Sequence, residues 1–255
     1  MLSWGLPASD APVLSALLGQ PLQLSPESLG LLTSGQPYQP NYGKDFPAQR
    51  ITTPLAWDDL DEVGMRNNPL LNQMDVIFDN FNSATAYSGP AAIRLLRASC
   101  GQSSHKNLYQ PAGNQCYLFD NLAKLGFTQH LMLGHNGQFG DFLKEVRAEG
   151  GMQAPLMDQT GLPVALLGFD GSPVYDDTAV LQRWLQTIEK DSNPRSATFY
   201  NTLLLHDGNH YPGVSKTADY KIRAQKFFDE LDAFFTELEK SGRKVMVIVV
   251  PEHGG

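Results

Sequence analysis

Hydrophobic and polar positions alternate regularly from about residue 57 to the end of the chain. Alternating or continuous apolar runs, which are typical of strands, cover residues 74–81, 127–133, 163–169, 198–205 and 245–250. Helical spacing covers residues 58–65, 91–99, 139–149, 177–190 and 216–241. Strands that alternate with helices predict an α/β fold with a mostly parallel sheet flanked by helices.

Two of these segments carry particular weight. Residues 245–250 are six consecutive apolar residues rich in β-branched types, which predicts a fully buried strand. The helix at 216–241 has one apolar stripe, and we interpret it as core packing rather than a cofactor site. Its members are Phe227, Phe228, Leu231, Phe234, Phe235 and Leu238.

Residues 1–50 have a different texture. They contain many of the prolines and show little sustained periodicity. We therefore predict a poorly ordered extension with one short helix near residues 11–18, separate from the regular part of the chain.

Composition excludes several classes of function. The chain has 255 residues, 42% of them apolar, and a formal net charge of −8. Because binding the phosphate backbone of a nucleic acid needs a basic surface, we expect no nucleic-acid partner. The apolar runs are only strand-length and the first residues lack a basic, apolar leader, so we expect neither a membrane span nor a signal peptide in this chain.

The two cysteines, Cys100 and Cys116, flank a turn-rich segment. They form neither a CxxC pair nor a metal-finger spacing. The sequence leaves two free thiols and a disulfide equally open. A disulfide around a loop of this size would contribute about 3 kcal/mol and would imply an oxidising compartment.

Three polar clusters lie beside predicted strands, where open α/β sheets place their ligands. Residues 85–88 lead into a helix, and Ser88 there is either an N-cap, which this cluster alone favours, or a nucleophile beside the helix N-terminus. Residues 206–210 contain His206 and His210 in a loop. Glu252 and His253 follow the strand at 245–250, and their residue types suit zinc.

The three clusters together favour one kind of chemistry. A hydroxyl nucleophile, a carboxylate and several histidines are the parts of a metal-assisted transferase or hydrolase. The metal would activate the serine, and the histidines would neutralise phosphoryl oxygens or protonate the leaving group.

Longer strings carry a resemblance to a known family. They are NFNSAT (80–85), YSGPAA (87–92), RLLRASCGQ (94–102), GFDGSPVYDD (168–177), HDGNHYPG (206–213) and PEHGG (251–255). Over about residues 54–255 the chain resembles the cellulose phosphoethanolamine transferases of bacterial cellulose-synthesis operons, the BcsG family. That family is similar to alkaline phosphatases and sulfatases, so the resemblance implies an alkaline-phosphatase-like sheet.

The resemblance implies a zinc enzyme that moves phosphoethanolamine from phosphatidylethanolamine to the 6-hydroxyls of cellulose. The family's catalytic domain is periplasmic and belongs to an inner-membrane protein, with subunits of the cellulose synthase complex as further partners. The implied roles are Ser88 as nucleophile and metal ligand, Glu252 and His253 as zinc ligands, His206 as a catalytic, phosphate-binding residue, Tyr87 and His210 as substrate-binding residues, and Cys100–Cys116 as a disulfide.

The chain departs from the family pattern in three places. The family's cysteine zinc ligand falls on Thr53, whose hydroxyl is a poorer ligand than a thiolate. Residues 1–50 do not resemble the family's membrane helices, and the family continues beyond Gly255. We therefore expect a partial catalytic domain at 54–255, incomplete at both ends. The alternatives are a related metal-dependent phosphate or sulfate ester hydrolase and a catalytically inactive fragment.

Overall fold

The structure, a computed structural model, describes residues 85–252. Elements predicted before residue 85, together with Thr53 and His253, lie outside this range. The helices are α5 (Ser88–Leu96), α6 (His105–Leu108), α7 (Leu118–Lys124), α8 (Phe142–Ala148), α9 (Asp177–Lys190) and α10 (Tyr220–Lys240). The strands are β1 (Thr128–Leu133), β2 (Val164–Leu167), β3 (Pro173–Tyr175) and β4 (Ser196–Asn201), and short 3₁₀ turns are η2 (Ala98–Gln102), η3 (Asn114–Cys116) and η4 (Phe139–Asp141).

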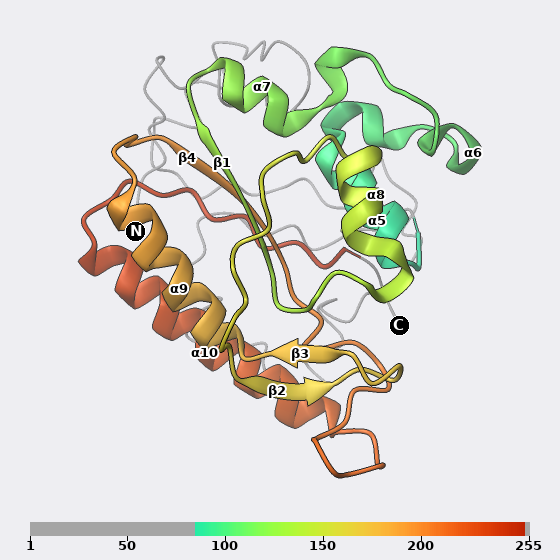
Figure 1. Ribbon diagram of the computed structural model, residues 1–255, viewed down its shortest axis with the longest axis vertical. Helices are drawn as coiled ribbons and strands as arrows, with labels where there is room; N and C mark the ends of the chain where they lie inside the picture. The colour runs from blue at the N-terminus through green and yellow to red at the C-terminus, as the bar shows by residue number, and fades with distance from the viewer. Residues whose placement is uncertain (1–84, 253–255) are drawn as a thin grey trace, which may run out of the picture.

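A parallel pair of strands, β1 and β4, forms the centre of the fold (Figure 1). Their register runs from Thr128 opposite Ser196 to Leu133 opposite Asn201. Helices α5 and α8 cover one face of the pair, and α9 and α10 cover the other. The predicted α/β class, with a parallel sheet flanked by helices, is confirmed.

Successive side chains of the two strands point to opposite faces, as the pleat requires. Leu131 and Leu133 of β1 pack into the core beneath α5 and α8, whereas Met132 packs beneath α9. On β4, Phe199 joins the first core and Tyr200 lies against the second. This alternation decides which polar residues at the strand ends reach each face.

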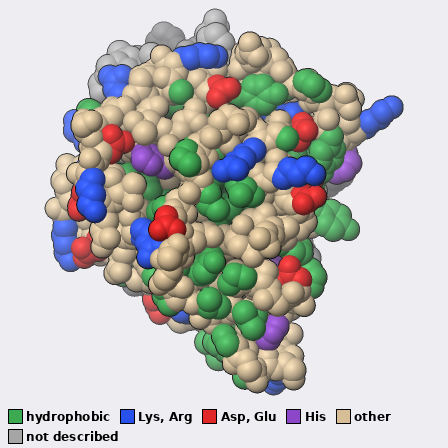
Figure 2. Space-filling model, viewed as in Figure 1, with side chains coloured by type: hydrophobic (Ala, Val, Ile, Leu, Met, Phe, Trp, Pro, Cys, Tyr) green, Lys and Arg blue, Asp and Glu red, His purple; other side chains and the backbone are tan. Residues whose placement is uncertain are grey.

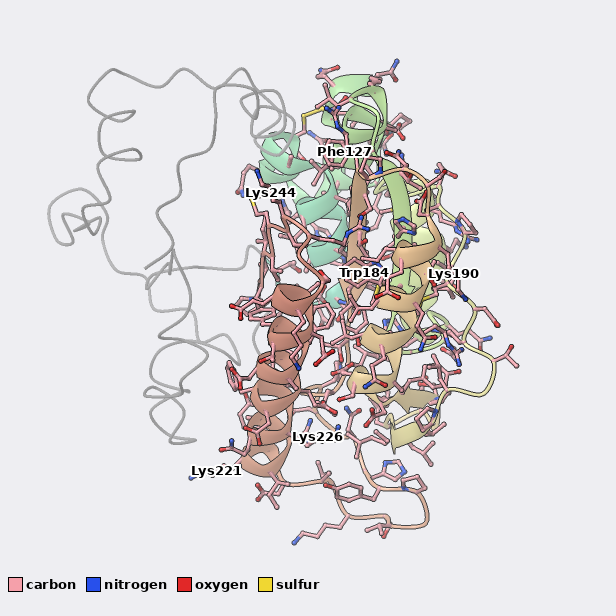
Figure 3. All side chains as sticks on the ribbon, turned by 90° about the vertical axis from the view of Figure 1, so that its left-hand side faces the viewer. Phe127, Trp184, Lys190, Lys221, Lys226 and Lys244 are labelled. Carbon is pink, nitrogen blue, oxygen red and sulfur yellow. A yellow bond between two sulfur atoms is a disulfide. The ribbon has the colours of Figure 1, made fainter. Side chains whose placement is uncertain are left out.

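Helices α9 and α10 lie side by side over the second face, as Figure 3 shows. Trp184 of α9 packs against Phe234 of α10, with ring centroids 5.8 Å apart. Its indole N–H donates to the Thr198 hydroxyl of β4 at 2.9 Å. The apolar stripe predicted for the last helix is core, because its members are buried or packed against buried residues.

A short antiparallel hairpin, β2–β3, was only half predicted. The sequence indicated β2, but β3 is three residues long and begins with a proline, too short for a periodicity signal. Leu166 and Val174 of the hairpin pack with Leu203 and Leu204, which follow β4. The hairpin thereby supports the loops beyond the carboxyl ends of the parallel pair.

The prediction of a buried strand at residues 245–250 is wrong. The segment has no regular secondary structure, and Val245 to Val249 are exposed. Among residues 85–252 no strand is hydrogen-bonded beside it, and a strand without a neighbour leaves its backbone groups to water. Apolar composition alone does not supply that neighbour.

Several other boundaries differ from prediction, and helix α10 begins at Tyr220 rather than at residue 216. Helix α5 begins at Ser88, three residues earlier than expected, and strand β4 ends at Asn201 rather than at residue 205. The helix predicted at 139–149 is divided by Gly140 and Asp141, which both have positive φ. Helix α9 has the predicted bounds, 177–190.

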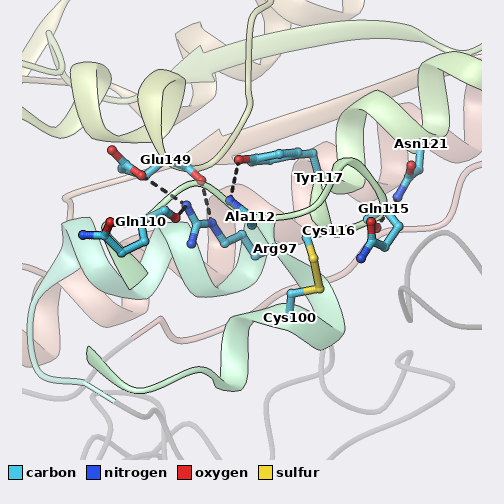
Figure 4. Close-up of a disulfide and its surroundings, with 9 residues drawn as sticks. All are labelled: Arg97, Cys100, Gln110, Ala112, Gln115, Cys116, Tyr117, Asn121 and Glu149. Atoms are coloured by element: carbon cyan, nitrogen blue, oxygen red, sulfur yellow. Dashed lines mark hydrogen bonds and ion pairs between the residues drawn. A yellow bond between two sulfur atoms is a disulfide. The ribbon is translucent and has the colours of Figure 1, made fainter. Parts of the chain in front are cut away.

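The disulfide implied by the family resemblance is confirmed. Cys100 and Cys116 are bonded and join η2 to η3, with 5.5 Å between their Cα atoms (Figure 4). Beside it, the buried Arg97 donates to the Glu149 carbonyl at 2.7 Å and forms an ion pair with the Glu149 carboxylate at 3.1 Å. These contacts tie the segment after α5 to the end of α8.

Charged side chains of both signs are scattered over the face seen in Figure 2. They are interspersed with apolar and neutral side chains rather than gathered by sign. Of the helices between residues 85 and 252, none is both long and apolar enough to cross a bilayer.

Candidate functional site

Ser88 is the first residue of α5, and its side chain is only 7% exposed. The N-cap position is taken by Tyr87, whose backbone is extended and whose side chain makes no capping hydrogen bond. The N-cap interpretation of Ser88 is therefore wrong. Tyr87 itself is 74% exposed, directly before the candidate nucleophile.

Glu252 brings the far end of the chain to Ser88. The Ser88 hydroxyl is a hydrogen-bond partner of the Glu252 carboxylate, and the Asn201 amide donates to Glu252 Oε2 at 3.0 Å. Glu252 keeps part of its surface accessible, but its carboxyl group is shielded. Burial raises the pKa of Glu252 to about 7, although the hydrogen bonds from Ser88 and Asn201 and the nearby His206 act against this.

His135, two residues after β1, is a site residue that the sequence analysis missed. Its Nε2 lies 2.8 Å from Asn201 Oδ1, and its Nδ1 accepts the Gly137 N–H at 3.1 Å. Burial lowers the pKa of His135 to about 4, so the imidazole is neutral at physiological pH. The signal was present, because a histidine directly after a strand is the criterion that selected the other clusters.

His206 lies near both of these residues. Its charge state affects Glu252 and His135 electrostatically, which places the three groups in one neighbourhood. Its ring contacts Phe139 edge-on and stacks on Phe169, with centroids 5.6 and 6.0 Å away. Nδ1 is 2.8 Å from the Asp207 carbonyl, which only accepts, so Nδ1 carries a proton.

The loop that carries His206 is held by buried donors. Arg223 of α10 donates to the carbonyls of Leu204 and His206 at 2.8 and 2.9 Å. Asn209 donates to the Leu203 carbonyl at 2.5 Å. The loop is therefore fixed although it has no regular secondary structure.

His210 is positioned mainly through its backbone. Its N–H and C=O both bond to Leu167 at the end of β2, at 2.9 and 2.8 Å. Its imidazole Nδ1 lies 3.3 Å from the Gly208 carbonyl. A substrate-binding role for Tyr87 or His210 stays a prediction.

The structure thus gathers Ser88, Glu252 and His206 at the carboxyl ends of β1 and β4. Within residues 85–252, no three His, Cys, Asp or Glu side chains are grouped so as to hold a metal ion. The predicted zinc set also requires His253 and Thr53, which lie outside the described residues. The oxygen atoms of Glu252 and Ser88 fit the oxygen ligands of such a zinc site, since a carboxylate shielded from water is stabilised by a bound cation.

Comparison with known proteins identifies the family. Residues 51–255 match the model of the cellulose biosynthesis protein BcsG C-terminal domain. The chain is 80% identical over 201 residues to the cellulose biosynthesis protein BcsG of Escherichia coli (strain K12) and 74% identical over the same length to that of Salmonella typhimurium (strain LT2). Each alignment covers 79% of this chain and 36% of the relative, so the chain spans about a third of these proteins. The chain belongs to the family of the BcsG C-terminal domain.

Proposed function

We propose that this chain acts in cellulose biosynthesis as a zinc-dependent phosphoethanolamine transferase. Phosphatidylethanolamine would be the donor and the 6-hydroxyl of a cellulose glucosyl unit the acceptor. In line with the family resemblance, we propose the periplasmic side of the inner membrane as its location and cellulose synthase subunits as its partners. The observation that carries the proposal is the contact between Ser88, at the start of α5, and the carboxylate of Glu252.

We propose that Glu252, His253 and Ser88 hold the zinc ion, with Thr53 at the fourth position. When bound, zinc would lower the pKa of a hydroxyl and neutralise charge on phosphoryl oxygens. The chemistry of Ser88 and Glu252 supports this proposal. Both present oxygen atoms, and the carboxylate is desolvated while its hydrogen-bond donors Ser88 and Asn201 are neutral.

In the first step, Ser88 Oγ attacks the phosphorus of the donor. A new Oγ–P bond forms and the bond from phosphorus to the diacylglycerol oxygen breaks. The hydroxyl proton is released to solvent, because the Glu252 carboxylate that contacts Ser88 must stay deprotonated to hold zinc. His206 enters this step as an imidazolium. Its Nδ1–H stays on the Asp207 carbonyl, and its Nε2–H protonates the departing diacylglycerol oxygen.

In the second step, the glucosyl 6-hydroxyl attacks the phosphorus of the phosphoethanolamine group on Ser88, and a new O6–P bond forms. The 6-hydroxyl proton passes to His206, the Oγ–P bond breaks, and Ser88 Oγ recovers a proton from solvent. The two steps restore every side chain to its starting state. Tyr87, which is exposed, and His210 are proposed to contact the substrates.

The test has two parts. Zinc is measured on the purified chain by elemental analysis, and the proposal expects about one tightly bound zinc that is lost in His253→Ala. The chain is then mixed with phosphatidylethanolamine, and phosphoethanolamine trapped on Ser88 is detected by peptide mass spectrometry. Ser88→Ala should show no adduct, and the exposed Ser192→Ala is the matched control.

Cello-oligosaccharide is added last. Phosphoethanolamine on the oligosaccharide supports transfer, whereas release only to water supports the related phosphate or sulfate ester hydrolase. A chain that binds no zinc and forms no adduct would contradict the proposal and would indicate a catalytically inactive fragment.

A further inference from the structure

A chain of hydrogen bonds runs from the backbone after β1 to the carboxylate of Glu252. It passes from the Gly137 N–H to His135, from His135 to Asn201, and from Asn201 to Glu252. We propose that His135 and Asn201 are positioning residues that fix the orientation of the Glu252 carboxylate beside Ser88. The inference deepens the proposed function and rests on the role given there to Glu252.

The direction of every bond in this chain is determined. A backbone N–H can only donate, so Nδ1 of His135 accepts and carries no proton. The proton of the neutral ring is therefore on Nε2, which donates to Asn201 Oδ1. The amide of Asn201 must then turn its Nδ2 toward Glu252, where it donates at 3.0 Å. Each group thus fixes the orientation of the next.

The surroundings keep this arrangement in one state. His135 is 1% exposed and Asn201 is also buried. A doubly protonated His135 would direct an N–H at the Gly137 N–H, so this series of hydrogen bonds requires the neutral ring. The ring also packs edge-on against Phe142, with centroids 5.2 Å apart, which restricts its rotation. Buried, fully bonded partners behind a ligand are the usual means of orienting it.

A positioning role differs from a purely structural one in what it changes. Leucine fills the space at either position but has no polar group. His135→Leu therefore removes the donor to Asn201, and Asn201→Leu removes the donor to Glu252. Glutamine at position 135 can still accept a hydrogen bond through Oε1 and donate one through Nε2, so it should preserve the hydrogen bonds to Gly137 and Asn201. His130, a partly exposed histidine within β1 that faces Asp191, provides the matched control as His130→Leu.

The first measurement is the zinc affinity of the folded chain, obtained by chelator competition. His135→Leu and Asn201→Leu should each weaken zinc binding about 10- to 100-fold. His135→Gln and His130→Leu should stay within about threefold of the parent chain by the same comparison. Parent-like affinity in folded His135→Leu and Asn201→Leu would overturn the proposal.

The second measurement needs no metal and therefore separates this inference from the proposed function. In the metal-free chain, ¹⁵N NMR should show His135 protonated on Nε2 alone at neutral pH. Glu252→Gln should shift the Asn201 side-chain amide signals, whereas His130→Leu should not. A His135 ring protonated on Nδ1, or an Asn201 amide unaffected by Glu252→Gln, would overturn the proposed hydrogen-bond series even where zinc binds. Should the parent chain bind no zinc, or a leucine variant fail to fold, these signals decide alone.

Discussion

Two carboxylates lie beyond the end of β4, on opposite faces of the parallel pair. Burial raises the pKa of each to about 7. Asp177, the first residue of α9, is 2% exposed and accepts bonds from the hydroxyls of Tyr200 and Thr202. Glu252 remains partly accessible and is bonded to Ser88 and Asn201.

The partners distinguish the two groups more clearly than the pKa does. Asp177 is enclosed by residues that join α9 to β4, and the adjacent Asp176 caps the same helix by accepting the Ala179 N–H at 3.1 Å. Glu252 instead contacts a serine at a helix start and lies near His206. A raised pKa therefore identifies both groups, and only access and neighbours indicate which one can perform chemistry.

The largest test of this comparison exchanges each carboxylate for its amide. Glu252→Gln should lower phosphoethanolamine transfer by at least about 10⁴-fold, as when one member of a catalytic unit is removed. Asp177→Asn should leave transfer within about threefold of the parent chain, since it touches no reacting group. The measurement is product formation from labelled phosphatidylethanolamine. Equal losses in the two variants would remove the distinction.

The next test uses the dependence of stability on pH. The folded-state pKa of Asp177, about 7, exceeds its ordinary value of 3.8, so the folded chain holds an extra proton between these values. Stability should therefore fall as the pH rises from about 4 to 7, by up to ~4 kcal/mol from this group. Asp177→Asn should reduce the measured slope in urea unfolding at several pH values, leaving the part that Glu252 contributes over the same range. An unchanged slope would contradict the buried acid.

Adjacent residues of β4 offer a smaller test. Tyr200→Phe removes a donor to Asp177 and should lower the free energy of unfolding by about 2 kcal/mol. Zinc affinity should not change, because Tyr200 points to the face away from Ser88. Chemical denaturation and chelator competition on the same sample check both parts. A Tyr200→Phe chain with weakened zinc binding would indicate that the two faces are coupled.

The helix starts give the smallest expected effects. Asp176→Ala removes the cap of α9 and should cost about 1 kcal/mol, with Asp176→Asn as the control that keeps the cap. Tyr87→Ala, at the start of α5, should change stability by less than about 0.5 kcal/mol, because its side chain is exposed and makes no cap. If Tyr87 contacts substrate, the same variant should raise KM, which steady-state kinetics would detect.

Much of the fold follows from local pattern. The α9 helix has the predicted bounds because Asp176 caps it and its apolar face faces a sheet. The β4 boundary was placed too late because Leu203 and Leu204 continue the apolar run, although they are buried in a loop core. The strand predicted at residues 245–250 is absent for another reason, since an apolar run contains no information about whether a neighbouring strand is there to pair with it.

The site was predicted in part. Ser88, His206 and Glu252 follow from polar residues beside strands, and the structure brings them together. His135 and Asn201 are separated by 66 residues and meet only because β1 and β4 are neighbours. No local pattern specifies that pairing, so the link from His135 through Asn201 to Glu252 could not be derived from the sequence alone.

The pleat of β4 has a consequence for mutation by insertion or deletion. Tyr200 and Asn201 serve different carboxylates only because consecutive residues face opposite ways. Loss of one residue within residues 196–199 would slip the strand by one position. The phenol would then face the side of Glu252 and the amide the side of Asp177, so each carboxylate would lose the donor that now fits it. This six-residue strand should therefore tolerate substitutions at its amino end far better than any change in its length.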